Sequence, residues 1–190
     1  MFIHFSKWIY TKSTGRVTLA GLLIFFAFSA LVLPAQSADA GEYSAGAGSP
    51  DTAFFYTPTD LYSFAEAYGE RGRAAYIQAR FTFDLLWPLV YTFFLATSIS
   101  WVFGRVLPDD HRWKAVNLAP VLGMLFDYLE NMSASIVMAR FPETTPIIEW
   151  LAPLFSLLKW SFISASFLLL LAGALLWMAR RVKDRGAGGG

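Results

Sequence analysis

Four long apolar segments are the feature that most constrains this chain. They are residues 17–34, 81–106, 115–139 and 147–180, in a sequence of which 56% is hydrophobic. A helix of about 20 mainly apolar residues is long enough to cross the hydrocarbon core of a bilayer. Only 15% of the residues are charged, against about 25% in a typical soluble domain. We therefore predict an all-α integral membrane protein, a four-helix bundle with a short extracytoplasmic amphipathic helix.

The distribution of charge predicts how this bundle would lie in a membrane. Lysine and arginine gather in residues 1–16, in residues 105–114 and in the C-terminal tail from residue 180, whereas acidic residues are frequent in residues 39–80. Cytoplasmic segments of membrane proteins are enriched in lysine and arginine. We therefore expect two cytoplasmic tails at the chain ends, a cytoplasmic loop over residues 107–114 and an outer turn over residues 140–146.

The first apolar segment has two interpretations. Residues 17–34 can be the first membrane helix, with basic residues before it and Pro34 at its end. This is the interpretation we favour; in the alternative they are part of a signal peptide cleaved after Ala40, because Ala38-Asp39-Ala40 has the small-x-small form of a cleavage site. N-terminal sequencing of the purified protein would separate these alternatives.

Between the first two apolar segments the composition changes. Residues 35–56 are rich in Ala, Gly and Ser, which predicts a flexible extracytoplasmic linker. Residues 57–80 form an amphipathic helical segment, in which Thr57 can act as the N-cap and Pro58 suits the first helical position. We expect its first helix to end at Gly69 and either to lie flat on the outer membrane surface or to cap the bundle.

Polar side chains inside the apolar segments are the best indication of function. Asp127, Glu130 and Asn131 lie in the middle of residues 115–139, and Lys159 lies in the last segment. Ionisable groups at such positions are costly, and they usually mark a functional site. Asp127 and Asn131 are four residues apart and share one helix face, and Glu130 flanks them.

We expect these groups to converge on one polar pocket that opens outward. Three acids and one lysine do not balance, so we expect Lys159 to pair with Glu130 or Asp127 while another carboxylate is protonated or holds a cation. If the protein is an enzyme, Asp127 or Glu130 would be its acid or base; the sequence leaves that question open. The predicted ligand-binding residues are Asp84, Tyr91, Asp127, Glu130, Asn131, Lys159 and Trp160.

Composition argues against several other functions. The formal net charge of +1 indicates no nucleic acid as a partner. The chain has no cysteine, which excludes thiolate metal sites, and its two histidines, His4 and His111, lie outside the apolar segments. We therefore predict no cofactor and no metal site.

Several short stretches resemble a family of small bacterial multi-pass membrane proteins. They are Phe54-Phe55-Tyr56-Thr57-Pro58, the stretch 67–73, the Asp84–Pro88–Tyr91 pattern, the stretch 125–131 and Leu158-Lys159-Trp160. The resemblance implies a location in the bacterial cell (inner) membrane, and it implies no particular chemistry.

The leading functional hypothesis is that the polar pocket binds a membrane lipid or a small lipophilic molecule. The first alternative is a non-catalytic accessory or assembly subunit, in which the polar cluster joins the helices by buried hydrogen bonds. The second alternative is proton- or ion-coupled transport. A homo-oligomer or another membrane protein as partner is compatible with all three hypotheses.

Overall fold

The computed structural model describes residues 2–109 and 111–187. Within these ranges the chain forms α-helices and short 3-10 helices and no strand, which confirms the predicted all-α fold. The elements are α1 (Phe2–Lys12), α2 (Gly15–Leu31), α3 (Leu33–Tyr43), η1 (Pro50–Thr52), α4 (Pro58–Arg80), α5 (Phe83–Val106), η2 (Arg112–Leu118), α6 (Ala119–Arg140) and α7 (Ile148–Ala187).

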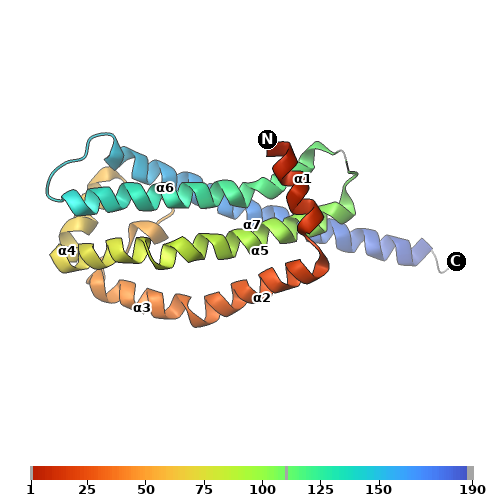
Figure 1. Ribbon diagram of the computed structural model, residues 1–190, viewed down its shortest axis with the longest axis horizontal. Helices are drawn as coiled ribbons and strands as arrows, with labels where there is room; N and C mark the ends of the chain where they lie inside the picture. The colour runs from red at the N-terminus through yellow and green to blue at the C-terminus, as the bar shows by residue number, and fades with distance from the viewer. Residues whose placement is uncertain (1, 110, 188–190) are drawn as a thin grey trace.

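The helices α2, α5, α6 and α7 run along the long axis of the molecule (Figure 1). The α6 helix packs along α7, α2 packs on α5, and α5 contacts both α6 and α7. The α4 helix lies at one end of this arrangement, and α1 crosses α5 at the other. We call these the α4 end and the α1 end.

Three helical stretches of the described chain are long and apolar enough to cross a membrane. They are Gly15–Tyr43, Pro58–Val106 and Ile148–Arg185. The α6 helix, which covers most of the predicted third span, is not among them. Asp127, Glu130 and Arg140 lie within it and lower its mean hydropathy, so α6 alone is the least suited of the four long helices to a lipid environment.

The N-terminal part of the chain is more ordered than we predicted. Residues 35–56 were expected to be a flexible linker, but residues 35–43 are helical, because the helix continues as α3 to Tyr43 and Pro34 stands in the first turn of α3. Residues 44–56 contain turns, irregular chain and the short 3-10 helix η1. Residues 1–16, expected to be a simple tail, contain α1 and the beginning of α2. The side-chain oxygen of Thr14 accepts a hydrogen bond from the Val17 amide and caps α2.

The α4 helix begins where we predicted and continues further. Thr57 and Asp60 form a reciprocal capping box, which confirms Thr57 as the N-cap. Gly69 was expected to end the helix, but it only interrupts it. Its φ of 62° and ψ of −178° are values that glycine adopts without a Cβ clash, and the chain then resumes a helical course to Arg80.

The last two long helices also differ from the predicted bounds. The segment expected as a helix over residues 115–139 begins as the 3-10 helix η2, and regular α-helix starts only at Ala119, with Pro120 in its first turn. The α7 helix continues to Ala187, through most of the expected C-terminal tail. Arginine and lysine are good helix formers, so the charged sequence after residue 180 extends the helix.

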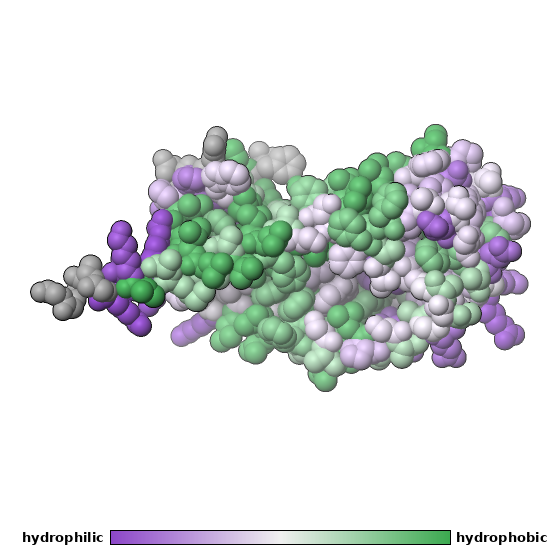
Figure 2. All heavy atoms as spheres, turned by 180° about the vertical axis from the view of Figure 1, so that it is seen from behind, coloured by the Kyte–Doolittle hydropathy of each residue, from purple (hydrophilic) through white to green (hydrophobic). Residues whose placement is uncertain are grey.

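Polar residues are buried and apolar residues exposed along much of the bundle. On α6, Asp127 and Glu130 are 5% and 1% exposed, whereas Leu125 and Met132 are 48% and 54% exposed. Figure 2 shows hydrophilic residues at the two ends of the molecule and mostly hydrophobic residues between them. This pattern is the reverse of that expected of a helix in water, and it places the polar groups where the helices meet.

Candidate functional site

The ammonium group of Lys159 is the centre of a buried charged cluster. Its Nζ atom lies 2.6 Å from Oε2 of Glu130, 3.0 Å from Oδ1 of Asp51 and 3.9 Å from Oδ1 of Asp127. It also donates a hydrogen bond to the backbone carbonyl of Asp51, at 3.2 Å. The Lys159 side chain is only 2% exposed. Three of these groups belong to α6 and α7: Asp127 and Glu130 to α6, and Lys159 to α7. The two helices pack along each other, which brings the three side chains together.

A second cation, Arg80, extends the cluster to α4 and α5. Its Nη1 atom lies 3.1 Å from Oδ2 of Asp51, and its Nε atom lies 2.6 Å from Oδ2 of Asp84. The guanidinium also stacks over the Tyr76 ring, 4.6 Å from the centroid. Asp51 therefore bridges Lys159 and Arg80, and a single loop carboxylate joins the two halves of the cluster.

Neutral donors complete the coordination of the α6 carboxylates. The Tyr91 hydroxyl donates to Oδ2 of Asp127 at 3.0 Å, and the Asn131 amide donates to Oδ1 of the same residue at 3.1 Å. The Tyr56 hydroxyl donates to Oε1 of Glu130 at 3.2 Å. Each carboxylate is thus oriented by a hydrogen bond and by a cation, which fixes its position.

The charged cluster is not electrically balanced. It contains four carboxylates, those of Asp51, Asp84, Asp127 and Glu130, and two cations, so with every group ionised its formal charge is −2. Uncompensated charge is costly to bury. Protons or a cationic group are needed to make the cluster neutral. Among the described residues, no group of His, Asp or Glu side chains has an arrangement suited to a metal ion.

Asp51 lies outside the long helices and differs from the other acids in its environment. Burial by itself would raise the pKa of its carboxyl, but Lys159 and Arg80 outweigh this effect and hold the pKa well below the usual range. Asp51 therefore remains ionised at neutral pH and supplies a fixed negative charge. Its side chain is 24% exposed, so this charge lies where the cluster meets solvent.

A cavity of about 350 Å³ lies beside Lys159. Asp51, Thr52, Asp127 and Lys159 line its polar side. Aromatic and aliphatic residues of α2, α3, α5 and α7 line the rest, including Phe25, Leu33, Trp87, Trp160, Ile163 and Phe167. Over the described residues, α2 and α7 both pack on α5 but make few contacts with each other, so the cavity lies between them with α5 as its floor.

The predicted site residues differ in how directly they contact Lys159. Lys159 contacts both Glu130 and Asp127, where we expected one partner. Asp84 joins only through Arg80. Among the remaining predicted residues, Tyr91 and Asn131 hold Asp127, and Tyr91 and Trp160 line the cavity.

Three members of the cluster were missed by the sequence analysis. Asp51 lies in the segment expected to be flexible, and nothing in its sequence neighbourhood marks it. Arg80 was treated as the boundary of a span, although its spacing of four residues from Asp84 is that of a helical ion pair. Tyr56 was noted only as part of a resemblance, and its hydroxyl is bonded to Glu130.

Comparison of the chain with protein families, with curated proteins and with solved structures finds no match.

Proposed function

We propose that this is a multi-pass membrane protein whose cavity beside Lys159 binds a lipid or a small amphiphile. The observation that carries this proposal is the two-sided lining of the cavity, which has charged groups on one side and aromatic and aliphatic groups on the other. A concave site with an apolar wall and a few convergent polar groups is the usual form of a site for a small ligand.

The exposed surface supports a membrane location with four spans, α2, α5, α6 and α7. Three helical stretches have suitable length and hydropathy, and the fourth helix, α6, turns its acids inward and exposes Leu125, Met132 and Ile136. A helix of this kind is compatible with lipid only when its polar face is covered by protein. The resemblance to small bacterial multi-pass membrane proteins agrees with such a bundle in the cell membrane.

Charge at the two ends supports an orientation with both termini cytoplasmic. The α1 end carries Lys7, Lys12, Arg16, Arg105 and Lys114. An excess of basic residues is typical of cytoplasmic segments, and an even number of spans returns the C-terminus to the same side. On this orientation, the charged cluster lies in the outer half of the membrane.

The contacts of α2 favour a retained first span over a cleaved signal peptide. Phe25 stacks on Phe94, with 4.6 Å between ring centroids, and also on Trp87, at 5.7 Å. Gly21 allows close approach, because a Cβ at that position would lie 3.3 Å from the Phe94 Cα atom. The α2 helix also supplies Phe25 to the cavity, so its removal would take away one wall.

The sequence led us to expect a pocket that opens outward, but the contacts around Lys159 favour a ligand route from the side, between α2 and α7. Lys159 is covered toward the α4 end by the loop that contains η1, because Ser156 donates to the Ala53 carbonyl at 3.0 Å and Lys159 binds Asp51. The apolar part of a ligand would lie against Phe25 and Phe167, and its polar group would lie near Asp127 and Lys159. This arrangement suits an amphiphile that arrives from the lipid.

The alternative of a structural cluster is favoured by one observation. Lys159 has carboxylate partners on three sides, and Asp127 and Glu130 each accept a tyrosine hydrogen bond. Such a cluster can hold helices together without a ligand, as expected of an accessory or assembly subunit. That reading explains the ion pairs, but it explains neither the adjoining cavity nor the excess of negative charge.

Native mass spectrometry of the protein extracted in a mild detergent tests the proposal. We expect a retained adduct with the mass of a lipid or amphiphile. The Phe167→Ala substitution removes part of the cavity wall and should reduce the adduct, whereas Phe26→Ala, at a 59% exposed site outside the cavity, should not. A wild-type protein without any adduct, or equal retention by both variants, would favour the structural alternative.

A further inference from the structure

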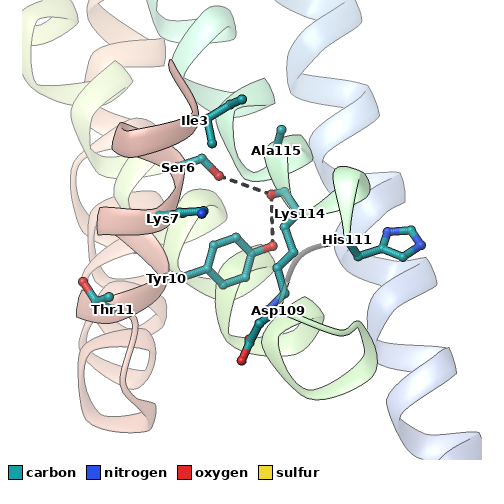
Figure 3. Close-up of a pocket in the computed structure, with 9 residues that line it drawn as sticks. All are labelled: Ile3, Ser6, Lys7, Tyr10, Thr11, Asp109, His111, Lys114 and Ala115. Atoms are coloured by element: carbon teal, nitrogen blue, oxygen red, sulfur yellow. Dashed lines mark hydrogen bonds and ion pairs between the residues drawn. The ribbon is translucent and has the colours of Figure 1, made fainter. Parts of the chain in front are cut away.

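A larger cavity, of about 730 Å³, lies at the α1 end of the molecule. Figure 3 shows it between α1 and the segment that connects α5 to η2. Ser6, Lys7 and Tyr10 of α1 line one side, and Asp109 and Lys114 line the other. No residue of the charged cluster around Lys159 lines this cavity, so it is a separate feature.

The walls of this cavity are fixed by buried hydrogen bonds. The Ser6 hydroxyl donates to Oδ1 of Asn117 at 2.7 Å, and the Asn117 amide donates to the Ser6 carbonyl at 3.2 Å and to the Ser100 hydroxyl at 2.9 Å. The Tyr10 hydroxyl donates to the Lys114 carbonyl at 3.0 Å. Burial raises the pKa of Tyr10, so its hydroxyl keeps the proton that it donates. These hydrogen bonds hold α1 against α5 and η2, and so they keep the walls of the cavity in place.

Lys114 is largely buried beside this cavity, and its counter-ion, Asp109, is exposed. The Lys114 side chain is only 13% exposed, and its Nζ atom lies 2.7 Å from Oδ1 of Asp109 and 5.1 Å from the centroid of the Tyr10 ring. The Asp109 side chain, in contrast, is fully exposed. An ion pair with a solvated partner contributes little to stability, so a stronger anion can replace Asp109 at small cost.

A second ammonium group is available on the opposite wall. Lys7 extends from α1 into the cavity in Figure 3, and its side chain is exposed. His111 also lines the cavity, but its ring points away from Lys7 and Tyr10 in the same view. Its Nδ1 atom accepts a hydrogen bond from the Trp113 amide, at 3.2 Å. Among the side chains that the structure describes, Lys7 and Lys114 are therefore the ammonium groups of the lining, and Ile3 and Tyr10 give it an apolar side.

We propose that this cavity binds a phosphate group, with Lys7 and Lys114 as its cationic contacts and Ile3 and Tyr10 against the attached organic part. A phosphate group carries several strong acceptor oxygens and can engage two lysines at once. Basic pockets beside membrane helices are suited to the phosphate of a lipid headgroup, and a soluble phosphorylated molecule offers the same chemistry. This proposal is independent of the one for the Lys159 cavity. The two cavities lie at different ends of the molecule, and the charge of the expected ligand differs.

Calorimetric titration of the full-length protein, in a non-ionic detergent and at low salt, tests this inference. The probes are a short-chain phosphatidic acid, a short-chain phosphatidylcholine, glycerol 3-phosphate and inorganic phosphate. We expect phosphatidic acid to bind about tenfold more tightly than phosphatidylcholine, because its phosphate has no cationic substituent to compete with the lysines. Binding of glycerol 3-phosphate or inorganic phosphate at similar affinity would identify a soluble ligand as the source, and binding of the lipid alone would identify a headgroup.

Matched variants separate this site from general electrostatic attraction. Lys7→Gln and Lys114→Met should each weaken phosphatidic acid binding by about three- to tenfold, since each removes a charge-assisted contact. Lys12→Gln, which removes the same charge from the same helix outside the cavity, should leave it unchanged. Asp109→Asn should strengthen binding, and Asp184→Asn, at an exposed site on α7, should not. No binding of any probe, or equal effects of Lys7→Gln and Lys12→Gln, would overturn the proposal.

Discussion

Polar groups are buried at both ends of this helical bundle, but they are paired by different kinds of interaction at the two ends. At the α4 end, the cluster around Lys159 joins carboxylates to cations and carries a formal excess of two negative charges when fully ionised. At the α1 end, Ser6, Ser100 and Asn117 form a neutral network in which Asn117 is 0% exposed. Among the described residues, no hydrogen bond joins the two networks.

The two networks differ in what their bonds leave over, and this difference underlies the proposed ligand site at the charged one. The neutral network satisfies its donors with its own acceptors, and it fixes α1 against α5 and η2. The charged network does the same for α4, α6 and α7, but at a greater desolvation cost and with charge left over. Neutral hydrogen bonds would join these helices more cheaply, so the charged cluster is the better candidate for a ligand site.

Among the variants that test this difference between the two networks, we expect Lys159→Met to lose the most stability. The substitution leaves Asp51, Asp127 and Glu130 without their shared cation, and loss of one partner of a buried pair costs about 3–5 kcal/mol of unfolding free energy. Thermal unfolding in detergent, with folded yield measured by size-exclusion chromatography, gives the readout. Lys183→Met, at an exposed position of the same helix, should have no effect.

A second substitution at Glu130 tests the pairing itself. Glu130→Gln in the Lys159→Met background should recover part of the lost stability, because it removes one of the orphaned charges. If neither Glu130→Gln nor Asp127→Asn restores any stability, the cluster does not depend on compensation of charge, and the contrast with the neutral network disappears.

A smaller and pH-dependent effect is expected from Asp51→Asn. Loss of a carboxylate that bonds two cations should cost about 1.5–3 kcal/mol at neutral pH. Because the folded pKa of Asp51 lies below its unfolded value, its contribution is complete above the unfolded pKa, about 4, and is lost as the pH falls toward the folded pKa. The difference in melting temperature between wild type and variant should therefore be constant from pH 7 to about pH 4 and narrow below that.

Asp39→Asn is the matched control for this experiment, since Asp39 lies at an exposed position of α3. A wild-type-to-variant difference for Asp51 that grows on acidification would contradict the assigned direction of the pKa shift.

The smallest of the three effects is expected at the neutral network. Asn117→Ala removes the partners of Ser6 and Ser100 and should cost about 1–2 kcal/mol, without pH dependence between pH 4 and pH 8. Tyr128→Phe removes one peripheral hydrogen bond, to the Leu85 carbonyl, and should stay within about 0.5 kcal/mol of wild type. Thermal unfolding gives both values. A loss from Asn117→Ala as large as that from Lys159→Met would show that charge is not what distinguishes the two ends.

The sequence predicted the charged cluster better than its surroundings. Asp127, Glu130, Asn131 and Lys159 could be grouped in advance, because each interrupts an apolar helix and has to be shielded by another one. Asp51 could not be grouped with them, because its position depends on a loop that returns over α7. Local composition favoured a flexible linker there, and contacts distant in sequence overrode that preference.

The α1 end shows the same limit more strongly. Ser6 and Asn117 are 111 residues apart, and neither serine nor asparagine in a short polar stretch has a pattern that predicts its partner. The lysine and arginine residues of the 105–114 segment led us to expect a cytoplasmic side for it, which stays a prediction, whereas the cavity beside Lys114 depends on where α1 crosses α5. The α1 helix itself was not predicted, and the point where it crosses α5 depends on tertiary packing.

The location of Lys159 on the last helix has a consequence for biosynthesis. The ribosome releases Asp127 and Glu130 of α6 before Lys159, their cationic partner, and α6 is not among the stretches apolar enough to cross a membrane. In a membrane, α6 would therefore be poorly retained until α7 follows it, so the two should partition into the bilayer as one hairpin. Truncation of the chain before α7 would then leave α6 without the helix that covers its acids.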